Sequence, residues 1–246
     1  MRLFRKIFAA YAIVLFLAMM LLSLPVLLWH MTFTPGARAL RRNIYFLHHV
    51  FTPAFLFLTG VRVRVSGSER IATDRAYIIV ANHRSAIDFI INAYAFPGIF
   101  RFLAKKELLA IPIFGWVVGK MCLIVDRSSQ SSRARSIALL AEQLAANWSI
   151  LIYPEGKRNR SNAPLAPFYD GAFRIAQQTG APLLIQTTLD VHRVSATAKA
   201  ADLWPGTVHI VWDGPIETQG TDIQTLKNQT RQIMEKRLVE AAAHTS

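Results

Sequence analysis

The chain has 246 residues and a formal net charge of +13. Hydrophobic residues make up 52% and charged residues 17%, which excludes an intrinsically disordered chain, because such chains are poor in apolar and rich in charged residues. The single cysteine, Cys122, excludes an internal disulfide framework and fits a reducing compartment.

Residues 1–60 contain six Lys and Arg residues and no Asp or Glu. Within them, residues 7–29 carry no charged side chain and predict a helix of about 34 Å, enough to cross a hydrocarbon core of about 30 Å. We expect a retained membrane anchor with a cytoplasmic N-terminus, because basic residues precede the apolar run and no small-x-small cleavage site follows it. Pro25 is expected to kink or end this helix.

A second apolar stretch, residues 44–58, follows a polar break that contains Pro35 and Gly36. It is short for a membrane span and is predicted to be interfacial or re-entrant. Either the first stretch crosses the membrane and the short second stretch returns the chain to the cytoplasm, or the two stretches form a hairpin within one leaflet. The sequence leaves both open. We therefore assign residues 1–60 to a membrane-binding module for anionic lipid, with no nucleic-acid partner.

From residue 61 onward, short apolar runs alternate with helical segments. The runs predict strands at residues 61–65, 77–80, 100–104, 123–125, 150–153, 183–188 and 208–212. Most are continuously apolar, as in parallel strands that are covered on both faces, whereas the first run alternates like an edge strand. Helices are predicted at residues 89–94, 131–147 and 223–238. Residues 61–246 thus predict an α/β domain, a central mostly parallel sheet covered by helices, behind the N-terminal apolar helical module.

The first candidate for chemistry is the segment NHRSAID at residues 82–88, between a predicted strand and a helix. This is where α/β proteins usually bind ligands. On one ideal helix, His83 and Asp88 would lie about 140° apart, so a turn is needed to bring them together. The carboxylate would then accept the imidazole N–H and leave the other nitrogen as a base. The alternative is a loop histidine beside an aspartate that caps the helix.

The second candidate is YPEGKRNR at residues 153–160, directly after a predicted strand. Gly156 permits a tight turn, and the basic residues, Arg158 among them, would present a phosphate-binding fork. The alternatives are a solvated basic loop and an internal pair between Glu155 and an arginine.

Two weaker candidates are also basic. Arg127 ends the predicted strand at residues 123–125 and would add a phosphate contact, unless Asp126 and Arg127 form an exposed turn. Lys105 precedes an apolar run and forms either a basic lip beside a membrane-touching segment or an ordinary amphipathic turn.

Other chemistries lack a sequence signal. The chain contains no GxxxxGK[ST], GxGxxG or GxSxG motif. Cys122 has no evident activating partner, so a thiol nucleophile is not expected. The histidines lack the spacing of metal ligands, and we expect no metal.

Taken in order, these motifs resemble those of the glycerophospholipid acyltransferase family, especially the 1-acylglycerol-3-phosphate acyltransferases, over about residues 60–216. NHRSAID matches the family pattern NHxxxxD, and YPEGKRN is similar to FPEGTRS. The segments IVDR at 124–127 and APLLI at 181–185 resemble the second and fourth motifs. Tyr153 stands where the family usually has phenylalanine, and Lys157 stands where it has threonine.

The resemblance implies transfer of a fatty acyl group from acyl-CoA or acyl carrier protein to the sn-2 hydroxyl of lysophosphatidate, giving phosphatidate. The alternative is an acyltransferase for another lysophospholipid acceptor. His83 would be the general base and Asp88 would orient it. No cofactor is implied beyond the acyl donor, and the implied location is the cytoplasmic face of the inner membrane if the source is bacterial.

The resemblance also implies roles for the remaining candidates. Arg127 and Arg158 would hold the acceptor phosphate, and Lys105 would assist them. Glu155 and Gly156 would shape that pocket.

Overall fold

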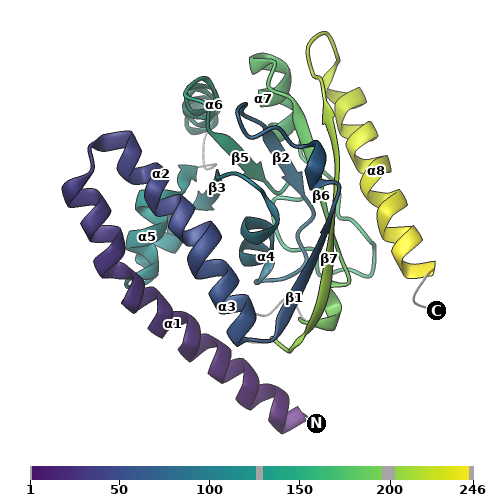
Figure 1. Ribbon diagram of the computed structural model, residues 1–246. Helices are drawn as coiled ribbons and strands as arrows, with labels where there is room; N and C mark the ends of the chain where they lie inside the picture. Colours follow the sequence, from purple (N-terminus) through teal and green to yellow (C-terminus); the bar gives the residue numbers. More distant parts are fainter. Residues whose placement is uncertain (1, 126–129, 196–202, 244–246) are drawn as a thin grey trace.

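The computed structural model describes residues 2–125, 130–195 and 203–243. Seven strands form one sheet in the order β1-β7-β6-β2-β5-β3-β4, and Figure 1 shows helices on both sides of it. Neighbouring strands run parallel except β6 and β7, which are antiparallel. The strands are β1 (Val61–Ser66), β2 (Ile78–Ala81), β3 (Phe100–Lys105), β4 (Leu123–Val125), β5 (Ser149–Ile152), β6 (Leu183–Leu189) and β7 (Gly206–Ile216).

The predicted α/β class and mostly parallel sheet are confirmed, and each predicted strand overlaps an observed one. The alternating run at residues 61–65 lies in β1, at an edge of the sheet as expected. β2 lies at the centre of the strand order, and its side chains are buried on both faces. Ile79 belongs to one apolar core, whereas Ile78 and Val80 belong to the other. Continuous apolar runs therefore mark strands that are covered on both faces.

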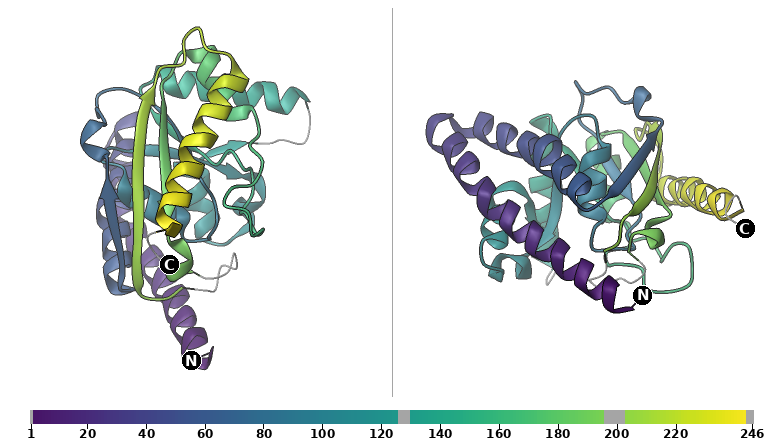
Figure 2. Two further views of the ribbon diagram at one scale, coloured as in Figure 1. Left: turned by 90° about the vertical axis from the view of Figure 1, so that its right-hand side faces the viewer. Right: turned by 60° about the horizontal axis from the view of Figure 1, so that its bottom comes forward.

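One core is covered by helices α6, α7 and α8 and the other by α4, α5 and the N-terminal helices. Figure 2 shows α8 on the opposite side of the sheet from α1. The helices of the α/β region are α4 (Asp88–Ala95), α5 (Phe114–Met121), α6 (Gln130–Ala145), α7 (Gly171–Thr179) and α8 (Ile223–Ala243), with short 3₁₀ turns η2 (Ser68–Arg70), η3 (Lys106–Ala110) and η4 (Val191–Arg193).

The N-terminal segment is a helical hairpin. Helix α1 (Arg2–Phe33) is followed by a helical return made of α2 (Gly36–Phe46), the π-helical turn η1 (Leu47–Phe51) and α3 (Thr52–Leu58), and the two arms lie side by side in Figures 1 and 2. Pro25 lies inside α1 and does not end it, because a proline removes only one helical hydrogen bond when neighbouring turns persist.

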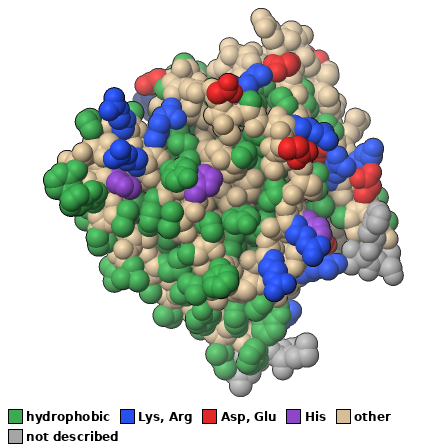
Figure 3. All heavy atoms as spheres, viewed as in Figure 1, with side chains coloured by type: hydrophobic (Ala, Val, Ile, Leu, Met, Phe, Trp, Pro, Cys, Tyr) green, Lys and Arg blue, Asp and Glu red, His purple; other side chains and the backbone are tan. Residues whose placement is uncertain are grey.

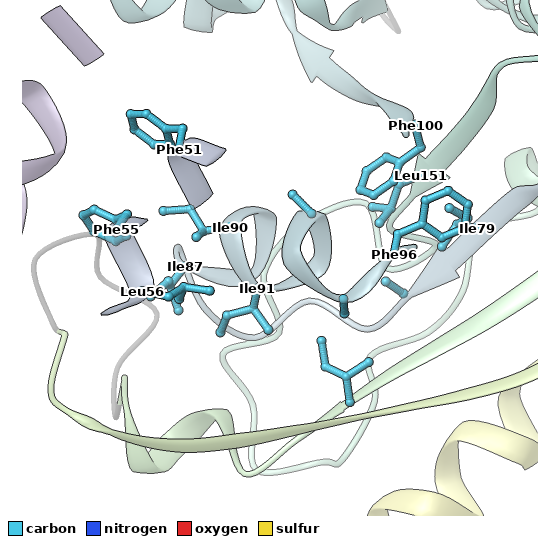
Figure 4. Packing of buried hydrophobic residues seen from close by; sticks show 14 of the residues in the cluster. Phe51, Phe55, Leu56, Ile79, Ile87, Ile90, Ile91, Phe96, Phe100 and Leu151 are labelled. Atoms are coloured by element: carbon cyan, nitrogen blue, oxygen red, sulfur yellow. The ribbon is translucent and has the colours of Figure 1, made fainter. Parts of the chain in front are cut away.

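The hairpin packs on the sheet domain through α4. Figure 4 shows Phe51 and Phe55 of the hairpin on one side of α4, while Ile79 and Leu151 of the sheet lie beyond it. Met20 and Leu27 of α1 belong to the same buried cluster. The hairpin therefore shares a core with the sheet, and the division at residue 60 stays a prediction.

The other face of the hairpin is apolar and exposed. Helix α1 is long and apolar enough to cross a membrane by length and composition. Val14, Leu22 and Phe57 are 65%, 75% and 83% exposed. Figure 3 shows hydrophobic side chains gathered over the hairpin side of the molecule. Exposed apolar patches of this kind mark interaction surfaces for membranes or proteins.

Candidate active site

His83 and Asp88 lie on the turn that joins β2 to α4. His83 Nδ1 is 2.9 Å from Asp88 Oδ2, so the turn brings the two residues together as predicted. The same oxygen accepts the backbone N–H groups of Arg84 and Ser85, each at 2.8 Å. The turn therefore wraps around a carboxylate that is 1% exposed. Because the carboxylate oxygen accepts all these bonds, Nδ1 carries the proton and Nε2 is left as an acceptor.

Glu155 joins this turn to the one after β5. Its Oε1 accepts the His83 N–H at 2.7 Å and its Oε2 accepts the Ala166 N–H at 2.8 Å. The Asn159 N–H donates to the His83 carbonyl oxygen at 2.7 Å. Burial raises the pKa of the Glu155 carboxyl, and these backbone hydrogen bonds partly offset that effect. Among the described residues, Glu155 thus pairs with backbone N–H groups rather than with an arginine, and it holds the backbone of the His83 turn.

The basic segment after β5 faces the same space as His83. Gly156 has φ +68°, a left-handed conformation that glycine adopts without strain, and its N–H closes the turn on the Tyr153 carbonyl at 3.0 Å. Arg158 is half-buried, and its Nη1 is buried without a hydrogen-bond partner among the described residues. Lys105 ends β3, is exposed, and faces the same space as His83.

A cavity of about 1260 Å³ links these groups. Its lining includes His83, Lys105, Gly156 and Arg158, so the structure brings together four of the predicted site residues. Asp88 and Glu155 stand behind this wall, each 1% exposed. Arg127 lies outside the described residues, so its predicted phosphate contact stays a prediction.

The rest of the cavity wall is mainly apolar and comes largely from the N-terminal hairpin, α4 and α5. Phe16 of α1 contacts four other aromatic rings in this part. The ring centroids are 5.7 to 6.1 Å apart, and the contacts are edge-to-face or tilted. Those rings belong to Phe51, Phe55, Phe89 and Phe114. The cavity therefore has a basic part near His83 and an apolar part beneath the hairpin.

The sequence profile of the acyltransferase family matches residues 62–188, just over half of the chain. The chain belongs to the acyltransferase family. The matched region contains His83, Asp88 and the basic turn, whereas the N-terminal hairpin lies before it.

This acyltransferase is similar to proteins named 1-acyl-sn-glycerol-3-phosphate acyltransferase. It is 28% identical to one from Cocos nucifera over 226 residues, which cover 89% of this chain and 70% of the relative. It is 37% identical to one from Borreliella burgdorferi over 130 residues, 52% of each chain. Across eight of the curated relatives that it matches, the chain spans between 46% and 70% of their length.

The fold is similar to that of the acyltransferase PlsC from Thermotoga maritima. The TM-score is 0.82, with 98% of each chain covered and 21% sequence identity. That crystal structure therefore supports the fold of this acyltransferase over nearly its whole length, including the hairpin.

Sequence reasoning missed the groups that hold the turn between His83 and Asp88 in place. Asn82 fastens the end of β2 to β6, because its side chain accepts the Thr188 N–H at 2.8 Å and donates to the Thr188 carbonyl at 3.0 Å. The signal that could have found Asn82 was its place beside His83 in the NHRSAID segment, but its partner lies 106 residues away. The ring of Tyr153 stacks on His83, a contact that its place in the YPEG segment did not predict.

The structure favours neither Ser85 nor Cys122 as a nucleophile. Ser85 is fully buried, and its Oγ donates to Ser195 Oγ at 2.7 Å. Burial raises the pKa of the Cys122 thiol to about 11. Within the described parts of the chain, no three His, Cys, Asp or Glu side chains are grouped so that they could hold a metal ion. The arrangement instead provides an oriented imidazole beside a large, two-part cavity.

Proposed function

We propose that this acyltransferase moves a fatty acyl group from the thioester of acyl-CoA or acyl carrier protein to the sn-2 hydroxyl of 1-acylglycerol-3-phosphate. The observation that carries the proposal is the single cavity that joins His83 to basic and apolar walls. This acceptor has a phosphate at one end, an acyl chain at the other and the reacting hydroxyl between them. The names of the relatives agree with this substrate.

The reaction needs a base because an alcohol is not ionised near neutral pH. His83 Nε2 accepts the hydroxyl proton as the oxygen attacks the thioester carbonyl carbon. Asp88 holds the imidazole through Nδ1 and stabilises the imidazolium that forms. The tetrahedral intermediate then collapses, the carbon–sulfur bond breaks, and the imidazolium returns the proton to the leaving thiolate. The products are the diacyl ester and the free thiol.

Transfer in this scheme is direct, without an acyl-enzyme. The acceptor hydroxyl takes the place that a serine nucleophile has in a hydrolase. The hydrogen bond from Ser85 to Ser195 supports this choice, because it directs the Ser85 hydroxyl to a partner other than His83.

Arg158 is the residue that we assign first to the acceptor phosphate. A buried guanidinium nitrogen without a partner is costly, and a phosphate oxygen would satisfy it with a charge-assisted hydrogen bond. Lys105 and Lys157 are exposed at the same cavity and add positive charge there. Gly156 keeps the turn tight enough to present these side chains together. Arg127 is proposed as a further phosphate ligand.

The apolar part of the cavity is proposed to hold acyl chain. The volume of the whole cavity, about 1260 Å³, exceeds the range of about 300–1,000 Å³ that is typical of small-molecule sites. Withdrawing a chain from the bilayer into water would cost about 0.8 kcal/mol per CH₂ group. A cavity beneath an exposed apolar hairpin avoids that cost, which supports a protein held at the membrane. Its site is proposed to face the cytoplasm, from which the acyl donor would enter.

The test is an acceptor panel with the purified full-length protein and labelled acyl-CoA or acyl carrier protein. The panel contains lysophosphatidate, the monoacylglycerol that lacks its phosphate, and lysophospholipids with larger head groups. We expect fastest turnover with lysophosphatidate. Equal turnover of the monoacylglycerol would contradict the phosphate site. Preference for a larger head group would show that the acceptor is another lysophospholipid.

A further inference from the structure

The imidazole of His83 is held on its face as well as on its edge. The ring of Tyr153 stacks on it with 4.0 Å between centroids and 15° between planes. The hydrogen bond to Asp88 fixes the position of Nδ1 but leaves the ring free to tilt about that bond. A flat aromatic surface against the imidazole removes that freedom, so two contacts together define the direction of Nε2.

Tyr153 is itself fixed by a buried amide. Asn92 Nδ2 donates to the Tyr153 hydroxyl at 3.0 Å, and Asn92 is fully buried on α4. Thr188 Oγ1 donates to Asn92 Oδ1 at 3.2 Å, and Gln186 Nε2 donates to the Asn92 carbonyl oxygen at 3.3 Å. Both partners lie on β6. The hydroxyl of Tyr153 is thus the end of a buried network that connects α4 and β6 to the base.

This network uses the hydroxyl group of Tyr153. A phenylalanine at this position, which the resembled family motif has, would keep the stack but could not accept the Asn92 hydrogen bond. Burial raises the pKa of Tyr153 well above its ordinary value, with the charge of Asp88 adding to the effect, so the phenol stays neutral and does not act as a competing base.

We infer that Tyr153 is a positioning residue for the acyl transfer, with its ring setting the plane of His83 and its hydroxyl locked by Asn92. The inference rests on the proposed function, because it takes His83 as the base. It predicts that the ring and the hydroxyl make separate contributions to turnover. It also predicts that the hydroxyl contributes only through Asn92.

The test compares five variants of the full-length protein with the acceptor that the wild type acylates fastest. Tyr153→Leu removes the stack and is expected to lower kcat about 10- to 100-fold with KM within about threefold. Tyr153→Phe keeps the stack and should recover most of that loss, with kcat about 2- to 10-fold below wild type. The kcat of Asn92→Ala should resemble that of Tyr153→Phe. The double variant with Tyr153→Phe and Asn92→Ala should have a kcat no lower than that of Asn92→Ala alone. Tyr94→Phe is the matched control on the same helix, because Tyr94 is 39% exposed, and its kcat should not change.

A second readout needs no turnover. In protein with ¹⁵N-labelled histidine, the His83 Nδ1 proton bound to Asp88 should give a low-field signal that His83→Ala removes. We expect this signal to persist in Tyr153→Phe and Tyr94→Phe and to broaden or vanish in Tyr153→Leu. Unchanged kcat and an unchanged signal in Tyr153→Leu would overturn the inference. If His83→Ala keeps turnover, the proposed role of His83 as the base is wrong. The Nδ1 proton signal in Tyr153→Leu still reports whether Tyr153 positions the imidazole ring.

Discussion

Glu155 holds the backbone of His83 from a turn 72 residues later, with 2.7 Å between its carboxylate and the His83 N–H. Glu155→Gln keeps one acceptor but turns an NH₂ group toward the N–H of His83 or Ala166. Leaving such a buried donor unpaired costs about 1–3 kcal/mol. We expect a fall in Tm of several degrees and reduced kcat, measured by thermal unfolding and acyl transfer. Glu69→Gln is the control, because Glu69 is exposed, and equal Tm values for the two variants would refute the role.

Asp88→Asn should disable turnover without loosening acceptor binding. The amide can present its NH₂ group to Nδ1 and favour the wrong imidazole tautomer. We expect kcat to fall about 10²- to 10⁴-fold with little change in KM, measured by steady-state kinetics. Asp74→Asn is the matched control at an exposed position and should match the wild type. A fall in kcat of less than about fivefold would argue against the orienting role.

Arg158→Ala should act selectively on acceptors that carry a phosphate. Hydrogen bonds to charged groups contribute about 1.5–3 kcal/mol, so kcat/KM for lysophosphatidate should fall about tenfold or more. Activity with the neutral monoacylglycerol should change little. Arg62→Ala, at an exposed position on the edge strand, is the control. Equal losses for both acceptors would mean that Arg158 supports the structure and does not bind phosphate.

The exposed face of α1 should carry membrane binding. Val14→Glu combined with Leu22→Glu places two charges on this face, where each side chain is more than 60% exposed. We expect binding to anionic vesicles, measured by co-sedimentation, to fall at least about tenfold. Val239→Glu is the control, because Val239 is 62% exposed on α8 across the sheet. Equal binding by the double variant and the control would place the membrane contact elsewhere.

Cys122 should be dispensable and slow to react. With a pKa of about 11, about 0.1% of the thiol is ionised at pH 8, and this fraction grows tenfold with each pH unit below the pKa. We expect Cys122→Ala to retain turnover, and alkylation by iodoacetamide to be slow at pH 8 and to accelerate steadily up to pH 10. Rapid modification at pH 8 would contradict the raised pKa of the thiol.

Local patterns predicted most of the fold. Each of the seven strands is marked by an apolar run, and β1 shows its edge position by alternation. The antiparallel pairing of β6 and β7 had no such signal, because strand direction depends on the connection between strands. The sequence left open whether Pro25 kinks or ends its helix, and α1 continues past it, because tertiary and neighbouring helical contacts decide whether a helix continues past a proline.

The candidate site was predictable where its partners are close in sequence. His83 and Asp88 are five residues apart, so a strand-to-helix turn was enough to suggest their contact. Glu155 and Asn82 act through partners 72 and 106 residues away, which no local pattern identifies. The alternative of an internal pair between Glu155 and an arginine is not seen among the described residues, because two backbone N–H groups donate to its oxygens.

The most direct test of the central claim compares wild-type protein with His83→Ala, using labelled acyl thioester and lysophosphatidate under identical vesicle conditions. Circular dichroism confirms that both are folded. The account predicts labelled phosphatidate from the wild type and a rate at least about 100-fold lower from the variant. A variant that forms phosphatidate within twofold of the wild-type rate would show that the imidazole is not the base.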